Sequence, residues 1–121
     1  MEKKRTLVLG ASQNTARYSN MAIKSLRNHE HSVVAIGRRA GLVGDTAIVT
    51  DQKPMDDIDT VTLYLNPTNQ KPYYNYILSL HPRRIIFNPG TENEELAELA
   101  LKNGILSQEA CTLVLLSTGQ Y

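Results

Sequence analysis

The chain has 121 residues, of which 41% are hydrophobic and 21% charged, with 13 lysines and arginines against 12 acidic residues. This length predicts one domain, residues 1–121, that can bury a sufficient core without disulfides or metals. A formal net charge of +1 argues against a nucleic-acid-binding surface, which needs a concentrated basic excess. The single cysteine excludes an internal disulfide. No apolar run approaches the ~20 residues of a membrane span, nor forms a signal-peptide core. We therefore expect a cytoplasmic globular protein that binds neither nucleic acid nor membrane.

Short apolar runs alternate with helical patterns in the first half of the chain. Residues 7–9 form a buried-strand pattern that stops at Gly10. Apolar positions then recur at helical spacing from about residue 18 to 29, which predicts an amphipathic helix. Two more short apolar runs, 33–36 and 47–49, predict the next strands.

The middle of the chain continues the alternation. Residues 51–59 contain a proline and too few apolar positions for a full helix, so they predict a loop or one helical turn. Residues 61–65 predict a strand, residues 71–80 a helix with Pro72 in its first turn, and residues 84–87 another strand.

The last part of the chain predicts one helix and one strand. Thr91 and Glu94 have the spacing of a capping box, with Thr91 as the N-cap. Gly104 is placed to end that helix. The apolar run 112–116 predicts the final strand.

Strands that alternate with helices imply right-handed crossovers and a parallel sheet with helices on both faces. The strand runs show little polar alternation, as expected for strands covered on both sides. The prediction is an α/β fold: a Rossmann-like, doubly wound parallel sheet in three layers. We expect five or six strands with the first one central and Gly10 at the carboxyl edge.

The turn after the first strand is the predicted ligand site, because such sheets bind ligands outside the carboxyl ends of their strands. Its glycine permits close backbone approach, and the following helix start offers free N–H groups and a positive dipole end to a phosphate. Ser12 and Thr15 replace the second and third glycines of the dinucleotide fingerprint, which favours a differently shaped diphosphate site. The predicted contacts are Gly10, Ala11, Ser12, Asn14, Arg17, Tyr18 and Ser19.

The residues after the second strand, Gly37, Arg38 and Arg39, point to a second phosphate. No acidic residue follows until Asp45, whereas binders of NAD place an acid there for the ribose 2′-hydroxyl. Two arginines instead favour a phosphate on the adenosine ribose. Both NADP, with a 2′-phosphate, and coenzyme A (CoA), with a 3′-phosphate, satisfy this chemistry.

Four segments together resemble a known family: Gly10-Ala11-Ser12, Arg17-Tyr18-Ser19, Asn88-Pro89-Gly90 and Asn93-Glu94-Glu95. In this order and spacing the chain is similar to the small bacterial CoA-binding proteins. Their fold is similar to that of the CoA-binding domain of the succinyl-CoA synthetase alpha subunit. The resemblance covers nearly the whole chain and implies a Rossmann-like domain that binds CoA or an acyl-CoA.

The resemblance also implies a role for each segment. The first turn and the helix start would contact the diphosphate, and residues 37–39 the adenosine and its 3′-phosphate. The pantetheine path would be lined by Asn66, Pro67, Asn88, Pro89 and Gly90. The family usually has Asn-Pro and a basic residue after the second strand, from which Gly37-Arg38-Arg39 departs. That ending also resembles some NADP-binding reductases, so NADP stays as the alternative cofactor.

The sequence offers no catalytic constellation. His29, His31 and His81 fall before strands, at the edge opposite the site, and are expected at the surface or at helix ends. Cys111 is expected before the last strand, again away from the site. No tyrosine has a lysine four residues later, and no metal-ligand spacing occurs. We therefore expect a non-catalytic module that binds a small molecule, CoA or an acyl-CoA. An NADP-binding reductase-like protein and an interaction domain with a vestigial nucleotide cleft are the alternatives, and the acyl group, oligomeric state and protein partner stay open.

Overall fold

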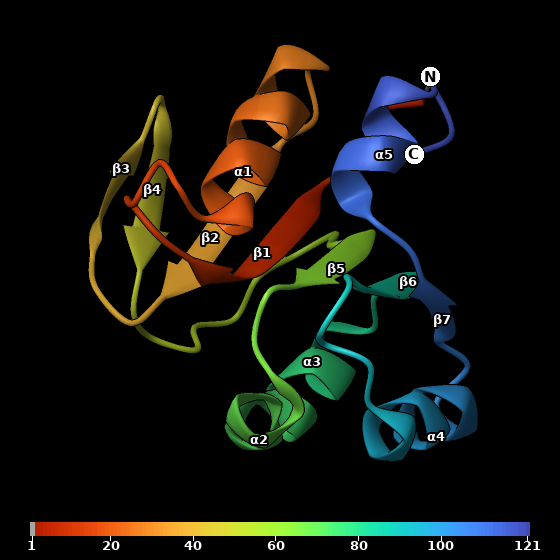
Figure 1. Cartoon of the computed structure of the whole chain (residues 1–121). Helices are drawn as coiled ribbons and strands as arrows, with labels where there is room; N and C mark the ends of the chain where they lie inside the picture. The colour runs from red at the N-terminus through yellow and green to blue at the C-terminus, as the bar shows by residue number, and fades with distance from the viewer. Residues whose placement is uncertain (1) are drawn as a thin grey trace.

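The computed structural model describes residues 2–121. Figure 1 shows its α-helices and strands. A 3₁₀ helix, η1, lies between α2 and α3 in the chain. In chain order they are β1 (Thr6–Ala11), α1 (Tyr18–Asn28), β2 (Val33–Gly37), β3 (Gly41–Val43), β4 (Thr46–Val49), β5 (Thr60–Leu63), α2 (Pro67–Gln70), η1 (Lys71–Tyr73), α3 (Tyr74–Leu80), β6 (Arg84–Phe87), α4 (Glu94–Lys102), β7 (Leu106–Glu109) and α5 (Thr112–Ser117).

One sheet of seven strands, in the order β3-β4-β2-β1-β5-β6-β7, runs through the molecule. All neighbouring strands pair in parallel except β3 and β4, which form an antiparallel pair. The predicted α/β, Rossmann-like sheet is confirmed, and β1 is its central strand. The predicted count of five or six strands is wrong, because β3 and β7 have no apolar run of their own.

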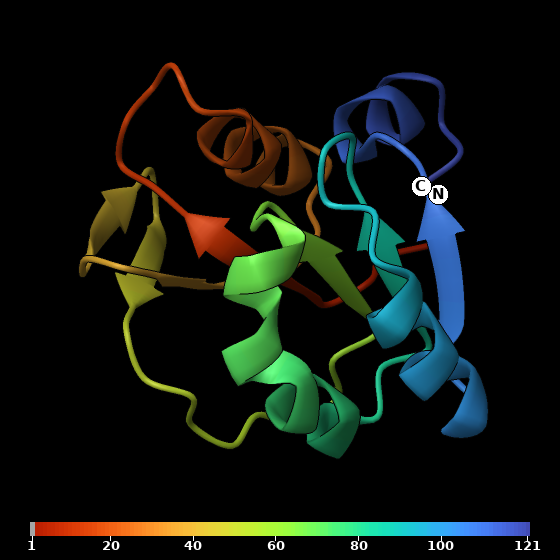
Figure 2. The ribbon, with the colours of Figure 1, turned by 60° about the horizontal axis from the view of Figure 1, so that its bottom comes forward.

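Helices cover both faces of the sheet, with α1 and α5 on one face and α2, α3 and α4 on the other (Figures 1 and 2). Alternate residues of β1 supply the two cores, since successive side chains of a strand point to opposite faces. Val8 packs with α1 and α5 residues in one buried cluster, while Leu7 and Leu9 pack with α3 and α4 residues in the other. The fold is therefore three-layered, as predicted.

The end of the chain corrects one prediction. Residues 112–116, predicted as the last strand, lie in helix α5, and the last strand is β7. The apolar run is buried at Thr112, Leu115 and Leu116, which is the i, i+3, i+4 spacing of one helix face. Strand β7 escaped the prediction because it is a sheet edge with β6 on one side only, and its Leu-Ser-Gln-Glu sequence is half-exposed.

Two helix starts differ from the prediction. The N-cap of α4 is Asn93, whose side chain accepts a hydrogen bond from the N–H of Leu96 (3.2 Å). Thr91 instead donates its hydroxyl to the carbonyl of Asn88 (2.8 Å), so it is not the N-cap. Helix formation after β5 begins at α2, where Asn66 accepts from the N–H of Asn69 (2.9 Å), earlier than the predicted residue 71. The predicted helix end at Gly104, with φ +71°, is confirmed just after α4.

The amino edge of the sheet holds a buried histidine that the sequence analysis expected at the surface or at a helix end. His31 is fully buried, and its Nδ1 accepts a hydrogen bond from the N–H of Lys4 (2.9 Å). The ring of Tyr121 lies 4.9 Å from it, centroid to centroid. His29 and His81 do lie at the C-terminal ends of α1 and α3. Among residues 2–121, no helix has the length and apolar character needed to cross a bilayer.

Candidate ligand-binding site

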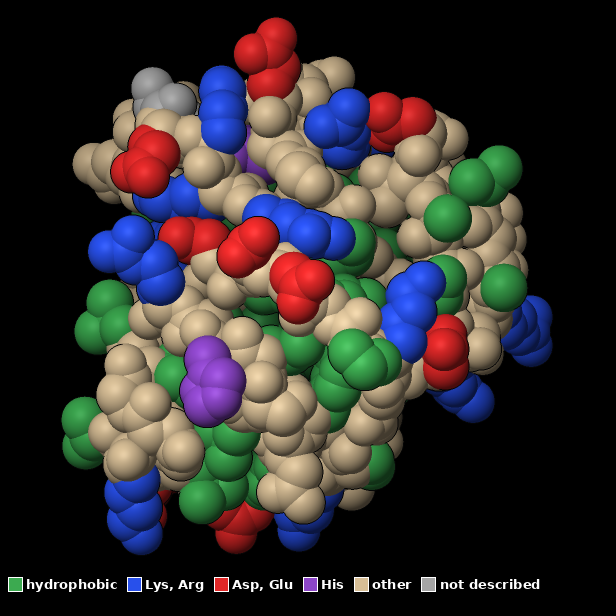
Figure 3. Space-filling model, turned by 180° about the vertical axis from the view of Figure 1, so that it is seen from behind, with side chains coloured by type: hydrophobic (Ala, Val, Ile, Leu, Met, Phe, Trp, Pro, Cys, Tyr) green, Lys and Arg blue, Asp and Glu red, His purple; other side chains and the backbone are tan. Residues whose placement is uncertain are grey.

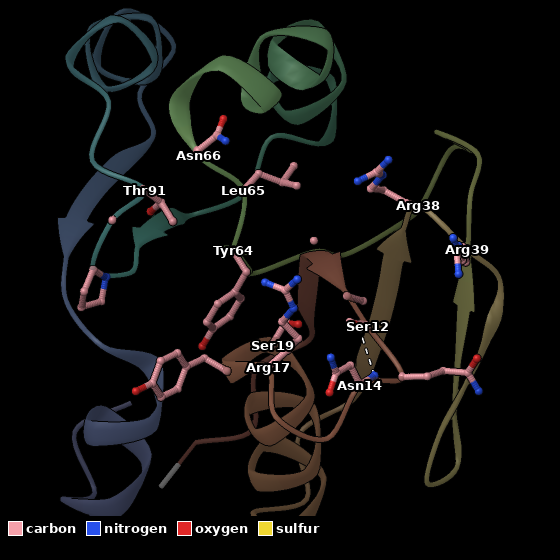
Figure 4. A pocket seen from close by; sticks show the side chains of 16 residues that line it. Ser12, Asn14, Arg17, Ser19, Arg38, Arg39, Tyr64, Leu65, Asn66 and Thr91 are labelled. Carbon is pink, nitrogen blue, oxygen red and sulfur yellow. Dashed lines mark hydrogen bonds between the residues drawn. The ribbon is translucent and has the colours of Figure 1, made fainter.

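An open cavity of ≈ 710 Å³ lies at the carboxyl edge of the sheet (Figure 4). Four parallel strands contribute to its walls through the segments that follow them: β1, β2, β5 and β6. Its lining residues are Gly10, Ala11, Ser12, Gln13, Asn14, Arg17, Tyr18, Ser19, Arg38, Arg39, Tyr64, Leu65, Asn66, Pro89, Gly90 and Thr91.

Gly10 shapes the floor of the cavity. Its φ is +93°, and a Cβ at this position would lie 3.0 Å from the carbonyl carbon and oxygen of Tyr64. The end of β1 and the residue after β5 therefore lie so close together that a side chain at position 10 would force one of them to shift. Gly37 has a similar role behind the cavity, where a Cβ would lie 2.3 Å from the carbonyl oxygen of Ala11. Gly37 permits the irregular pairing of β1 with β2 at Ala11 and does not line the cavity.

The turn between β1 and α1 is organised by its own hydrogen bonds. The hydroxyl of Ser12 accepts from the N–H of Asn14 (3.1 Å), the dashed line in Figure 4. The side chain of Asn14 accepts from the N–H of Ala16 (3.0 Å). Asn20 on α1 donates its amide to the carbonyl of Ser12 (3.0 Å). These bonds hold the turn in shape before any ligand arrives, and they leave the Ser12 hydroxyl proton and the Asn14 amide protons available to a ligand.

Three arginines line the cavity: Arg17 from the start of α1, and Arg38 and Arg39 from the segment after β2 (Figure 4). All three are exposed, and none of the hydrogen bonds or ion pairs within residues 2–121 uses their guanidinium groups. Arg27, in contrast, pairs with Asp45 at 2.9 Å. On the face in Figure 3, acidic and basic side chains lie side by side. The cavity thus gathers cations that the fold leaves unneutralised, which is the electrostatic requirement of an anion site.

The wall from β5 and β6 is polar but uncharged. Asn66 lines the cavity, and its side-chain oxygen caps α2 by accepting from the N–H of Asn69 (2.9 Å). Asn88 is buried behind the wall and donates to the Thr62 hydroxyl (2.7 Å) and the Leu63 carbonyl (2.8 Å). Its side-chain oxygen accepts from the N–H of Thr112 (2.9 Å). Asn88 therefore ties β6 to β5 and α5.

A comparison with protein-family models matches residues 4–117 to the family described as the CoA binding domain. The chain belongs to this family of CoA-binding domains. An uncharacterized protein of known crystal structure is 49% identical to it, with a TM-score of 0.97 and full coverage of both chains. A comparison with curated protein sequences gives no significant match.

More distant structures share the fold of this CoA-binding domain. A hypothetical protein from Pyrococcus horikoshii is 21% identical, with a TM-score of 0.85 over 93% of this chain and 81% of its own. An oxidoreductase from Bacillus cereus is 14% identical, with a TM-score of 0.60 over 88% of this chain and 34% of its own. At these identities the likeness concerns the sheet and its helices alone.

The predicted site residues of this CoA-binding domain fall into two groups, those that line the cavity and those that do not. Twelve of them line the cavity, namely all seven of the first turn together with Arg38, Arg39, Asn66, Pro89 and Gly90. Gly37, Pro67 and Asn88 do not line it. Sequence reasoning missed four lining residues, which are Gln13, Tyr64, Leu65 and Thr91. Tyr64 and Leu65 were predicted inside the strand 61–65, but β5 ends at Leu63, so both residues lie at the carboxyl edge.

Two further groups near this edge bear on chemistry. Burial raises the pKa of Tyr64 well above its ordinary value, so its phenol stays neutral. Cys111 was expected before the last strand, which is wrong, because it follows β7 and precedes α5. It does not line the cavity.

Proposed function

We propose that this protein binds CoA or an acyl-CoA along the carboxyl-edge cavity without catalysing a reaction of its own. The observation that carries the proposal is the set of three unpaired arginines in a cavity of a CoA-binding domain. CoA has two anionic parts, a diphosphate and a ribose 3′-phosphate. Arg17 and the preformed turn suit the diphosphate, while Arg38 and Arg39 suit the ribose phosphate. The pantetheine arm would then run along Asn66, Pro89 and Gly90.

The absence of catalysis is supported by the titratable groups at the cavity. Its lining holds three arginines and two tyrosines, Tyr18 and Tyr64, but no carboxylate, histidine or cysteine. Within residues 2–121, no group of three or more His, Cys, Asp or Glu side chains could hold a metal ion. A general acid or base works best with a pKa near the operating pH, and none of the lining side chains is of such a type. The site therefore suits a carrier or sensor of CoA.

Calorimetric titration with CoA tests the proposal. Removal of one charge-assisted contact costs about 1.5–3 kcal/mol, so Arg17→Ala should weaken CoA binding about 10- to 150-fold. Arg83→Ala is the matched control, because Arg83 is an exposed arginine just before β6, at the opposite edge of the sheet. Its CoA affinity should equal that of the wild type. An unchanged affinity in Arg17→Ala would exclude the assigned diphosphate site.

The ribose phosphate is tested with dephospho-CoA, which lacks the 3′-phosphate. CoA should bind more tightly than dephospho-CoA, and Arg38→Ala should reduce the difference. NADP presents a similar phosphate to the same arginines but requires a pocket for its nicotinamide ring. NADP binding tenfold tighter than CoA would overturn the choice of ligand in favour of a reductase-like protein.

A further inference from the structure

Charge is distributed unevenly along the cavity. The lining from β1, β2 and the start of α1 contains all three arginines, Arg17, Arg38 and Arg39. The lining from the segments after β5 and β6 runs from Tyr64 to Asn66 and from Pro89 to Thr91, and none of these residues is charged. Figure 4 shows Asn66 and Thr91 on the side of the cavity away from Arg38 and Arg39. The cavity therefore has a cationic half and a neutral half.

A carboxylate borders the neutral half. Glu92, an exposed residue on the loop between β6 and α4, accepts a hydrogen bond at its Oε1 from the N–H of Gly90 (2.9 Å). Gly90 lines the cavity, has φ +90° and has no atom within 4 Å of the position a Cβ would take. The Gly90 N–H, which could donate to a ligand oxygen, thus already donates to the carboxylate of Glu92.

No ion pair of the described residues includes Glu92. The ion pairs found within residues 2–121 join Lys3 to Glu30 and Arg27 to Asp45, both remote in sequence from the β6–α4 loop. Arg38 and Arg39 line the other half of the cavity, and Figure 4 draws Arg17 between the two halves, next to Tyr64. A second carboxylate brought to Gly90 would therefore meet a like charge, lose part of its hydration and find no basic partner.

We propose that Glu92 makes this site selective for CoA carrying a free thiol or a neutral acyl group, against acyl groups that end in a carboxylate. The inference rests on the proposed function, in which the ribose phosphate lies at Arg38 and Arg39. The far end of the ligand, with its sulfur and acyl group, then reaches the Gly90 side. For two like charges about 6 Å apart, repulsion weakens binding about threefold at the dielectric constant of water and about 100-fold at that of a protein surface. Glu92 is exposed, so we expect an intermediate effect of about tenfold.

The test compares two CoA thioesters of equal chain length, butyryl-CoA and succinyl-CoA, which differ by a terminal carboxylate. With the wild-type protein, calorimetry should show succinyl-CoA binding about tenfold more weakly than butyryl-CoA. Glu92→Gln keeps an oxygen that accepts from the Gly90 N–H but removes the charge. In this variant the difference should fall below about threefold, because succinyl-CoA binds more tightly while butyryl-CoA does not change.

Glu98→Gln is the matched control, since it removes the same charge from an exposed residue of α4 that, unlike Glu92, accepts no hydrogen bond from the Gly90 N–H. It should keep the wild-type ratio. Equal affinities of the two thioesters in the wild type, or an unchanged ratio in Glu92→Gln, would overturn the role of Glu92 while CoA binding itself stands. Failure of CoA to bind at all would instead overturn the proposed function, and the selectivity with it.

Discussion

Replacement of Gly10 by alanine should destabilise the protein through a clash that the structure locates. A Cβ at Gly10 would lie 3.0 Å from the Tyr64 carbonyl and 3.2 Å from Cδ2 of Leu65. Tyr64 is held by the bond from its N–H to the Leu9 carbonyl (2.9 Å) and follows the fully buried Leu63, so its backbone cannot move away easily. Overpacking of this kind costs about 1–3 kcal/mol. The positive φ of +93° adds about 1–2 kcal/mol for a residue with a Cβ.

Gly90→Ala separates the two contributions. Gly90 has nearly the same φ, +90°, but nothing within 4 Å of a Cβ, so it bears only the conformational cost. The entropy that alanine removes from the unfolded chain is common to both variants and cancels. An unfolding entropy of about 2.1 cal/mol/K per residue makes 1 kcal/mol equivalent to roughly 4 °C in Tm at this length. Without ligand, calorimetry should show Gly10→Ala melting about 4–12 °C below Gly90→Ala. Equal melting temperatures would refute the close approach of β1 and β5.

Two further predictions concern side chains whose burial the sequence did not reveal, those of Asn88 and His31. Asn88→Ala should lower the free energy of unfolding in urea by about 3 kcal/mol, because it leaves the buried Leu63 carbonyl and Thr112 N–H without their hydrogen bonds. Asn66→Ala removes only an exposed helix cap and should lower it by about 1 kcal/mol. Similar losses in the two variants would contradict the different roles of Asn88 and Asn66. Burial lowers the pKa of His31 below 6.5, with nearby cations, Lys3 first, acting in the same direction. The folded state thus binds this proton less tightly than the unfolded state, and stability should fall as pH drops below about 6.5. Urea unfolding at pH 7.5 and 5.5 should give a lower free energy at pH 5.5, and His31→Gln should reduce the difference; equal values in the wild type would show that His31 does not titrate with unfolding.

The central strands could be predicted because their burial is visible in a few consecutive residues. The strands β1, β2, β5 and β6 are short apolar runs buried on both faces, and each leaves a clear pattern in the sequence. The edges could not be predicted in this way. Strand β7 is held by its pairing with β6, from Arg84↔Leu106 to Phe87↔Glu109, and not by apolar side chains of its own. An edge strand of this kind depends on tertiary pairing, which leaves no hydrophobic pattern in the sequence.

The candidate site shows the same limit at the level of single side chains. Asn66 and Asn88 both follow a strand and precede a proline, and this position correctly indicates the carboxyl edge of the sheet. Position does not indicate direction, however. Asn66 lies at the cavity rim, whereas Asn88 turns inward to Thr62 and Leu63. Gly10 and Gly37 differ in a similar way, since only Gly10 lines the cavity.

The arginines show why charge in the sequence becomes informative only once the fold is known. Arg27 is bound to Asp45 and to the carbonyl of His31. Arg84 donates to the Thr60 hydroxyl and lies 4.5 Å from the centre of the Tyr121 ring. These charges stabilise the structure and are not available to a ligand. Arg17, Arg38 and Arg39 have no such partner among residues 2–121, and they are the arginines that we propose to bind phosphate. In the proposed function, Arg38 and Arg39 on one side of the cavity and Glu92 at the border of the other would favour one orientation of CoA, with its ribose phosphate at the β2 end and its sulfur toward β6.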